Sequence, residues 1–114
     1  MSAAYTGITV EQRACYDLTL TIAQNGSIYD LTDVSLTGQI RRDFDDELQA
    51  VFTTEILSIA SGTAKISLNA SQTAAIDLAP CSWDLYADKT GSRAGECPDK
   101  LLYGPVYVIK NATQ

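Results

Sequence analysis

The segment from Tyr29 to Arg42 decides the expected fold, and it reads Tyr-Asp-Leu-Thr-Asp-Val-Ser-Leu-Thr-Gly-Gln-Ile-Arg-Arg. Its first part, Asp30 to Asp33, is rich in turn-forming residues. After that turn, Val34, Leu36 and Ile40 occupy alternate positions, with polar side chains between them. Because successive side chains of a strand point to opposite faces, this alternation predicts a β-strand with one buried face and one wet face.

The same alternation recurs along the rest of the chain and predicts an all-β protein. Turn-forming residues separate the alternating segments at intervals of about a dozen residues, which is typical of β-sandwiches. We therefore expect an antiparallel β-sandwich of about seven strands. Besides the segment already quoted, the expected strands lie at 8–10, 16–22, 51–59, 64–68, 81–89 and 101–110.

Local signals add a hairpin and a helical turn to this expectation. Asn25-Gly26 supplies the positive φ angles that a tight turn needs, so a hairpin should follow the 16–22 strand. Ser71 can cap a short helical turn over 71–76, which we expect at a corner between the two sheets. Pro105 lacks a backbone donor and indicates a sheet edge or a bulge near it.

The apolar sides of these strands supply one candidate core. Trp83 lies on such a side, so we expect it to be a core residue rather than a platform for a ligand. The expected core residues are Tyr16, Leu18, Leu20, Ile22, Val34, Leu36, Ile40, Ile56, Ile66, Leu68, Trp83, Leu85, Val106 and Val108.

Composition favours a single globular domain over 1–114 with no nucleic-acid partner. Apolar residues make up 46% of the 114 residues, enough for a packed core. The formal net charge of −6 would repel a phosphate backbone. Neither a secretory signal nor an apolar run of about 20 residues is present, so membrane insertion and secretion are not expected.

The cysteines leave two possibilities open. Cys15, Cys81 and Cys97 are an odd and widely spaced set. Reduced thiols, as expected of a protein assembled in the cytoplasm, are one interpretation. A single bridge between Cys15 and Cys81 is the other.

No catalytic centre or cofactor site is expected from the sequence. The chain contains no histidine, which removes the commonest general base, the usual zinc ligand and every Ser-His or Cys-His pair. The acidic run Asp43 to Glu47 has oxygen ligands that suit calcium. Leu48 and Thr54 occupy its sixth and twelfth positions, where an EF-hand loop needs glycine and glutamate, so a solvated loop is the competing interpretation.

Tyrosines and a pair of arginines are the candidate contact residues. Several tyrosines fall opposite the expected core or near segment ends, and exposed tyrosines suit protein contacts. Arg41 and Arg42 end the opening strand, and the core does not need them. They are either protein contacts or solvated charges. The candidate protein contacts are Arg41, Arg42, Tyr29, Tyr86, Tyr103 and Tyr107.

The order of the segments resembles a family of small virion domains of tailed bacteriophages, typified by the N-terminal domain of upper baseplate proteins. Nearly the whole chain takes part, although Trp83 stands where that family usually has tyrosine. The resembling stretches are DLTLTI, YDLTDVSLTGQIRR, SGTAKISLNASQTAAI, WDLYADKTG and LLYGPVYVIKNAT. The matching positions are Asp30 to Thr32, Gly38, Arg41, Arg42, Gly62, Ile66, Leu68, Thr73, Trp83 to Leu85, Leu101, Leu102, Gly104, Val106 and Val108.

This resemblance implies an immunoglobulin-like β-sandwich and a structural, non-enzymatic role. The expected protein is a tail or baseplate adaptor, assembled in the host cytoplasm, that binds other virion proteins in a symmetric, oligomeric assembly. A capsid decoration (cement) protein is one alternative within the virion. A stand-alone β-sandwich module that binds a carbohydrate or another ligand is an alternative from a different class.

Overall fold

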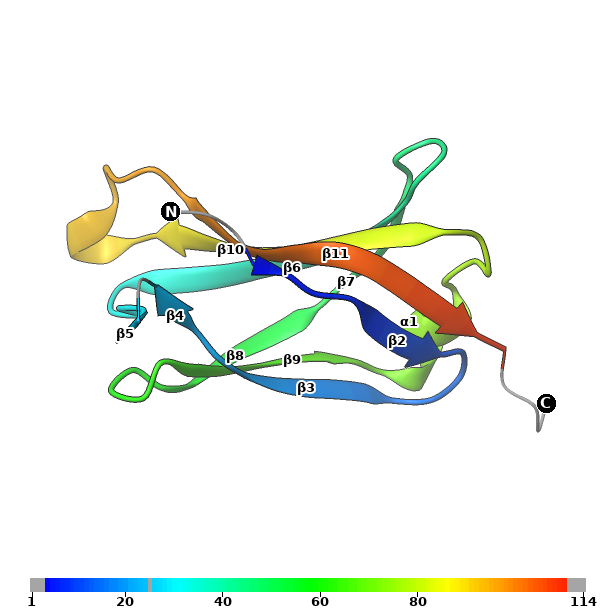
Figure 1. Ribbon diagram of the computed structural model, residues 1–114, viewed down its shortest axis with the longest axis horizontal. Helices are drawn as coiled ribbons and strands as arrows, with labels where there is room; N and C mark the ends of the chain where they lie inside the picture. The colour runs from blue at the N-terminus through cyan, green and yellow to red at the C-terminus, as the bar shows by residue number, and fades with distance from the viewer. Residues whose placement is uncertain (1–3, 25, 111–114) are drawn as a thin grey trace.

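The computed structural model describes residues 4–24 and 26–110, and within them the chain forms two facing β-sheets (Figure 1). This confirms the predicted all-β, sandwich-like fold. Asn25 of the expected turn and the C-terminal residues 111–114 lie outside the described residues. The strands are β1 Ala4–Tyr5, β2 Ile8–Glu11, β3 Tyr16–Thr21, β4 Ala23–Gln24, β5 Ser27–Ile28, β6 Val34–Arg42, β7 Leu48–Val51, β8 Thr53–Ser58, β9 Thr63–Leu68, β10 Cys81–Lys89 and β11 Asp99–Ile109. The helices are α1 Ala70–Ala74 and the 3-10 helix η1 Gly91–Arg93.

The larger sheet has the order β1-β11-β10-β6-β7, and β2 also lies beside β11. The opening sequence segment forms β6, which pairs antiparallel with all of β10, from Val34 opposite Lys89 to Arg42 opposite Cys81. The N-terminal strands β1 and β2 run parallel to β11, so a purely antiparallel sheet is wrong at this edge. A parallel pair needs a long connection, and here nearly the whole chain separates the two partners.

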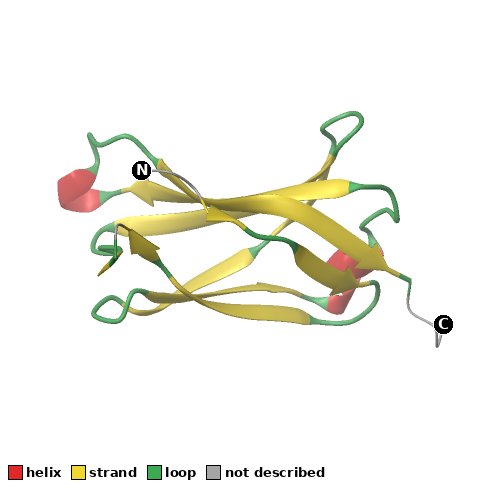
Figure 2. Ribbon diagram, viewed as in Figure 1, coloured by secondary structure: helices red, strands yellow, loops and turns green. Residues whose placement is uncertain are grey.

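The smaller sheet has the order β3-β9-β8. Beyond β3 the chain forms the expected hairpin, β4 with β5, and Gly26 has a φ of 79°. This hairpin is short, and it lies between β3, which belongs to the smaller sheet, and β6, which belongs to the larger one (Figure 2). The chain therefore passes from one layer of the sandwich to the other between β3 and β6.

Phe52 divides the expected 51–59 strand between the two sheets. Its backbone N–H donates to the carbonyl of Gly38 at 2.9 Å, between the end of β7 and the start of β8. Its ring is buried and packs against Trp83, with 5.9 Å between the ring centroids. A Cβ on Gly38 would lie 3.0 Å from the Phe52 ring, so the missing side chain of Gly38 makes room for it. Divisions of this kind explain why the described residues contain eleven strands instead of about seven.

The short helix α1 closes one end of the sandwich, but Ser71 does not cap it. Asn69 is the N-cap: its side chain accepts from the Gln72 N–H at 2.8 Å, and the Gln72 side chain accepts from the Asn69 N–H at 2.9 Å. Thr73 is fully buried and donates to the carbonyl of Ala14 at 2.9 Å. These bonds join α1 to the segment before β3.

The core contains most of the expected residues, with differences at its margins. Tyr16, Leu18, Leu20, Ile56 and Val108 are only partly buried, and all but Val108 lie on edge strands of the smaller sheet. The buried residues that were not among the expected core residues are Ile8, Val10, Tyr29, Leu31, Ala50, Phe52, Ala64, Ile76, Cys81, Ala87 and Leu101. Leu101 is buried and Leu102 partly buried where the pairing of β10 with β11 shifts register between Leu85 and Tyr86.

Cys15, Cys81 and Cys97 are free thiols, so the alternative bridge between Cys15 and Cys81 is wrong. Cys81 is buried, and that burial raises the pKa of its thiol. Among the described residues, none of the helices has the length and apolar character needed to cross a membrane.

We predict that Ile66→Ala lowers the free energy of unfolding by about 2–5 kcal/mol, because Ile66 is completely buried in the central strand of the smaller sheet. Leu20→Ala should cost less, since Leu20 is partly exposed on the edge strand β3. Chemical denaturation of both variants measures the difference. Equal losses would contradict this placement of the two side chains.

Candidate contact face

The register of the larger sheet brings polar and aromatic side chains into rows on its outer face. Gln39 lies opposite Asp84, Asp84 opposite Tyr103, and Tyr103 opposite Tyr5, which places one side chain on each of β6, β10, β11 and β1. Side chains directly opposite each other on neighbouring strands share a face. We call this outer face the contact face.

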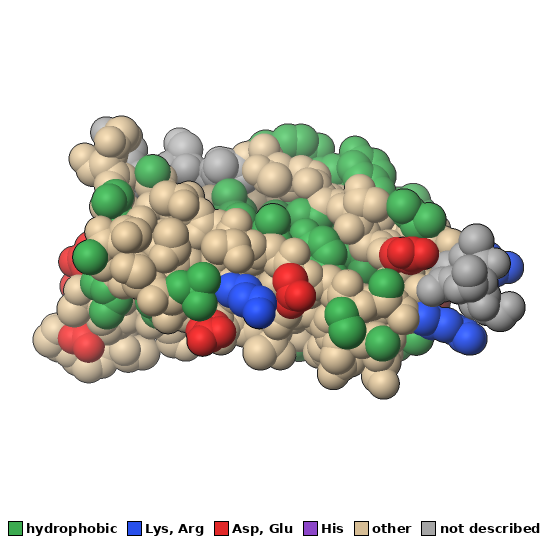
Figure 3. Space-filling view, turned by 90° about the horizontal axis from the view of Figure 1, so that it is seen from below, with side chains coloured by type: hydrophobic (Ala, Val, Ile, Leu, Met, Phe, Trp, Pro, Cys, Tyr) green, Lys and Arg blue, Asp and Glu red, His purple; other side chains and the backbone are tan. Residues whose placement is uncertain are grey.

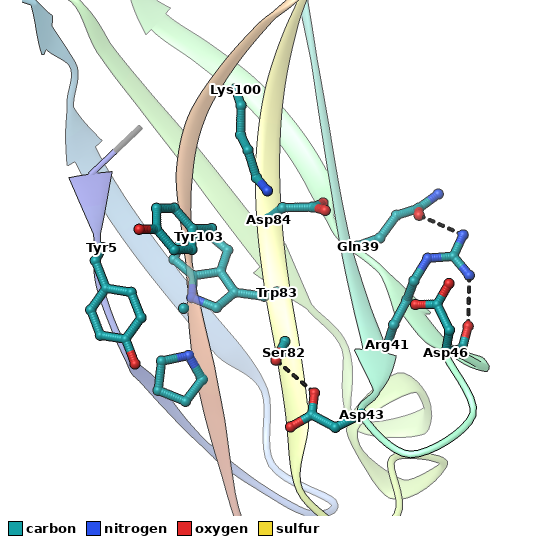
Figure 4. A pocket seen from close by; sticks show the side chains of 12 residues that line it. Tyr5, Gln39, Arg41, Asp43, Asp46, Ser82, Trp83, Asp84, Lys100 and Tyr103 are labelled. Carbon is teal, nitrogen blue, oxygen red and sulfur yellow. Dashed lines mark hydrogen bonds between the residues drawn. The ribbon is translucent and has the colours of Figure 1, made fainter. Parts of the chain in front are cut away.

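A shallow hollow of about 380 Å³ lies on the contact face (Figure 4). Aromatic side chains stand on one side of it and charged side chains on the other, and Asp84 lies between them. Its lining side chains include Tyr5, Gln39, Arg41, Asp43, Asp46, Ser82, Asp84, Lys100 and Tyr103. We call it the polar hollow.

The aromatic side of the polar hollow is built by Tyr5 and Tyr103. Their rings meet edge to face, with 5.3 Å between centroids and 74° between planes. Tyr5 is 67% exposed, so one face of its ring is open to solvent. The ammonium of Lys100 lies 5.1 Å from the centroid of Tyr103 and 5.8 Å from that of Tyr86. These cation–π contacts hold Lys100 across the upper end of the hollow.

The opposite side is fixed by hydrogen bonds. Arg41 donates from Nη1 to the carbonyl of Asp46 and from Nη2 to Oε1 of Gln39, both at 3.0 Å. Ser82 Oγ donates to Asp43 Oδ1 at 2.6 Å (Figure 4). The side chains on this side are therefore already ordered.

Asp84 is a half-buried carboxylate in the polar hollow. Among the described residues, its oxygens have no hydrogen-bond or ion-pair partner. No hydrogen bond affects its pKa, which is raised by burial and drawn downward by the charges of Lys100 and Arg41. Throughout the described residues, every fully buried side-chain nitrogen or oxygen has a hydrogen-bond partner. The unpartnered oxygens of Asp84 are therefore open to the polar hollow.

An apolar groove of about 340 Å³ adjoins the polar hollow, and Asp43 and Pro105 line both. Leu78 and Tyr107, which are 55% and 60% exposed, stand on its sides. Its remaining lining comes from residues 79–81 and from Val106 and Val108. The contact face thus joins an apolar groove to a polar hollow.

Arg42, one of the candidate contact residues, is not free to meet a partner. Its guanidinium pairs with Asp45 at 2.7 Å and also with Glu47 and Asp77, and only 16% of the side chain is exposed. These hydrogen bonds raise the pKa of Arg42 and lower that of Asp45. Arg42 points to the buried side of β6, where it extends past the core and ties the acidic loop to the segment before β10.

The acidic loop is exposed, as the solvated-loop interpretation expects, and part of its charge is paired. Two of its carboxylates, Asp45 and Glu47, face Arg42, and Asp43 accepts from Ser82. Across the described residues, no three Asp, Glu, Cys or His side chains come together as a metal ion would require.

Tyr29 is also unavailable to a partner, which corrects the expectation from the sequence. Only 4% of it is exposed, and its hydroxyl donates to Asp99 at 2.6 Å. The ammonium of Lys89, with 4% of its side chain exposed, lies 3.2 Å from Asp99 and 3.6 Å from Glu96. Burial, followed by the hydrogen bond to Asp99, raises the pKa of Tyr29. This cluster fastens the loop before β6 to the loop before β11.

The other candidates lie on the contact face. Arg41 and Tyr103 line the polar hollow, Tyr107 lines the apolar groove, and Tyr86 is half-buried beneath Lys100. The sequence analysis did not select Tyr5, Asp84, Lys100 or Leu78. Asp84 was recognisable as a polar residue alternating with Trp83 and Leu85, but its neighbours follow only from strand order.

On the opposite face of the sandwich, the described strands contain a single tyrosine, Tyr16. This face is formed by β3, β9 and β8, and Figure 3, which views this side, shows mainly backbone and uncharged polar side chains with scattered hydrophobic and charged side chains. Lys65 lies 3.9 Å from Asp17 there, and Thr19 and Glu55 are its cross-strand neighbours. The contact face is therefore the stronger candidate for binding.

We predict that Gly104→Ala displaces β1 and lowers stability by about 1–3 kcal/mol. A Cβ on Gly104 would lie 2.0 Å from the carbonyl oxygen of Thr6, which accepts a 2.8 Å hydrogen bond from Trp83 Nε1. The indole N–H resonance of Trp83 in NMR reports that bond. Gly95→Ala is the matched control, since a Cβ there has no neighbour within 4 Å. An unchanged indole resonance in Gly104→Ala would contradict the packing.

We predict that Asp99→Asn destabilises the protein by about 1–3 kcal/mol at neutral pH, because it removes a charged acceptor from Tyr29 and Lys89. The hydrogen bond from Tyr29, with help from Lys89, lowers the pKa of Asp99 from its ordinary 3.8. The stabilisation is therefore complete above that value and is lost as the pH falls below it. Unfolding measured from neutral to acidic pH should show the two proteins converging; a constant difference would contradict this.

A scan against models of protein families finds no match to this chain. A search of curated proteins also finds none.

Proposed function

We propose that this protein is a structural component of a tailed bacteriophage particle, most specifically a tail or baseplate adaptor that links neighbouring tail or fibre proteins. The order of sequence motifs described above supports the phage class. The absence of histidine from the chain agrees with a role without acid–base chemistry.

The apolar groove is the observation that carries the adaptor role. Leu78 and Tyr107 are both more than half exposed, and they line the groove together with Pro80 and Pro105. Aromatic side chains surrounded by apolar surface are enriched in protein interfaces, where their burial supplies most of the free energy of binding. The occupant that we assign to this groove is a neighbouring virion protein.

The polar surroundings of the groove suit an interface that has to be specific. Asp43 stands at the boundary between groove and hollow, held by Ser82. A fixed polar rim around an apolar centre excludes partners that do not match it. Arg41, held by Gln39 and Asp46, adds a positive charge to the adjoining hollow.

We predict that the double substitution Leu78→Ser with Tyr107→Ser abolishes incorporation into phage particles and leaves the fold intact, since both side chains are more than half exposed. Mass spectrometry of purified particles measures incorporation, and circular dichroism checks the fold. Leu57→Ser is the matched control, because Leu57 is 48% exposed on β8 of the other sheet.

Three results would contradict the proposal. Absence of the wild-type protein from particles would exclude any virion role. Normal incorporation of the double variant would exclude the apolar groove as the contact. Localisation of the protein on purified capsids instead of tails would assign it to capsid decoration.

A further inference from the structure

We propose that the polar hollow binds a neutral carbohydrate, with a sugar ring against Tyr5 and Tyr103 and with sugar hydroxyls bonded to Asp84 and Arg41. This binding goes beyond the assembly role, which rests on the apolar groove. The two sites share Asp43 and Pro105, but the side chains assigned here to the sugar line only the hollow, and Leu78 and Tyr107 line only the groove. Each site can therefore be removed without the other.

Asp84 supplies the first argument, because it is a half-buried acceptor without a donor among the described residues. A carboxylate that has lost part of its hydration is stabilised when a ligand donates hydrogen bonds to it. Two carboxylate oxygens can accept from adjacent hydroxyls of one sugar. The position of Asp84 between the aromatic and charged sides of the hollow lets it reach a ligand held by both (Figure 4).

The balance of charge around Asp84 indicates a neutral ligand. Lys100 and Arg41 stand on either side of it, and the acids Asp43 and Asp46 also line the hollow. A cationic ligand meets Lys100 and Arg41, and an anionic ligand meets the three carboxylates. A hydroxyl both donates and accepts, so a sugar can satisfy the carboxylate and the guanidinium together.

The tyrosine pair supplies an apolar surface for the ring of the sugar. Tyr5 is 67% exposed, and its edge-to-face contact with Tyr103 fixes the orientation of the two rings. The face of an aromatic ring is electron-rich and attracts the slightly positive C–H groups of a pyranose. One open ring face beside a row of hydrogen-bonding groups is the arrangement that such a ligand needs.

The hollow is also ordered before any ligand arrives. Two of the N–H groups of Arg41 are engaged by Gln39 and Asp46, which leaves others of its five for a ligand. Lys100 rests on the rings of Tyr86 and Tyr103. Side chains that are already fixed lose little conformational entropy on binding.

The experiment is an NMR titration of the ¹⁵N-labelled protein with methyl glucoside, methyl galactoside and N-acetylglucosamine, alongside a printed array of neutral oligosaccharides. Sialylated and sulfated glycans on the same array are the charged comparison. We expect binding of neutral sugars, with amide shift changes confined to residues of the polar hollow.

Variants assign the binding to named side chains. Tyr5→Ala and Asp84→Asn should each weaken the affinity by about tenfold or more, while Tyr107→Ser in the apolar groove retains it. Asp84→Asn keeps the size of the side chain, and circular dichroism of both variants confirms that they are folded.

Several outcomes would overturn the proposal. They are the absence of binding to every neutral sugar, preference for charged glycans, and unchanged affinity in both variants. Loss of particle incorporation by Tyr5→Ala, without any sugar binding by wild type, would show that the hollow is instead a protein contact.

Sugar binding that survives in a Tyr107→Ser variant excluded from particles would support the proposal, because it would separate sugar binding from assembly.

Discussion

The pairing of β6 with β10 is the interaction on which the rest of the structure depends. It runs along the full length of both strands and lies in the middle of the larger sheet, with β7 beyond β6 and β11 beyond β10. On the inner face it brings Ile40 beside Trp83 and Leu36 beside Ala87, all of them buried. Because side chains alternate, the same register places Gln39 beside Asp84 on the outer face. A shift of this register by one residue would turn the core side chains of a strand to the outer face and its contact-face side chains to the core.

The second constraint joins the two ends of the chain. The segment between β1 and β2 crosses directly over Gly104, where only a glycine lets two backbones come so close. There the carbonyl of Thr6 accepts the indole N–H of Trp83, which satisfies the polar atom of a side chain that is otherwise buried. This contact brings Tyr5 next to Tyr103 and completes the aromatic side of the polar hollow. The N-terminal strand therefore serves both the fold and the candidate site.

Charged clusters hold the loops at the two ends of the larger sheet. At one end of β10, Arg42 is surrounded by carboxylates from two segments, and at the other, Lys89 lies against Asp99 and Glu96. A single exposed ion pair contributes little to stability. The Lys89 side chain is buried, however, and a buried ammonium without a carboxylate partner would destabilise the protein. The first cluster engages Arg42, which the sequence analysis named as a candidate contact. The charges left on the contact face, Arg41 and Asp84 among them, are the ones that a partner can meet.

The sequence by itself determined the all-β class, the positions of the main strands and the majority of the core, because a period of two directly reflects which side chains share a face. It also showed Asp84 alternating with buried neighbours. Only the tertiary structure decided which strands are neighbours, since pairing between segments far apart in the chain leaves no local signal. Tyr5 meets Tyr103 through a parallel pair that spans nearly the whole chain, and Arg42 and Tyr29 are withdrawn from the surface by carboxylates 35 and 70 residues away. The contact face exists because strand order brings Tyr5, Tyr103 and Asp84 into one row, and that order depends on packing across the whole sandwich.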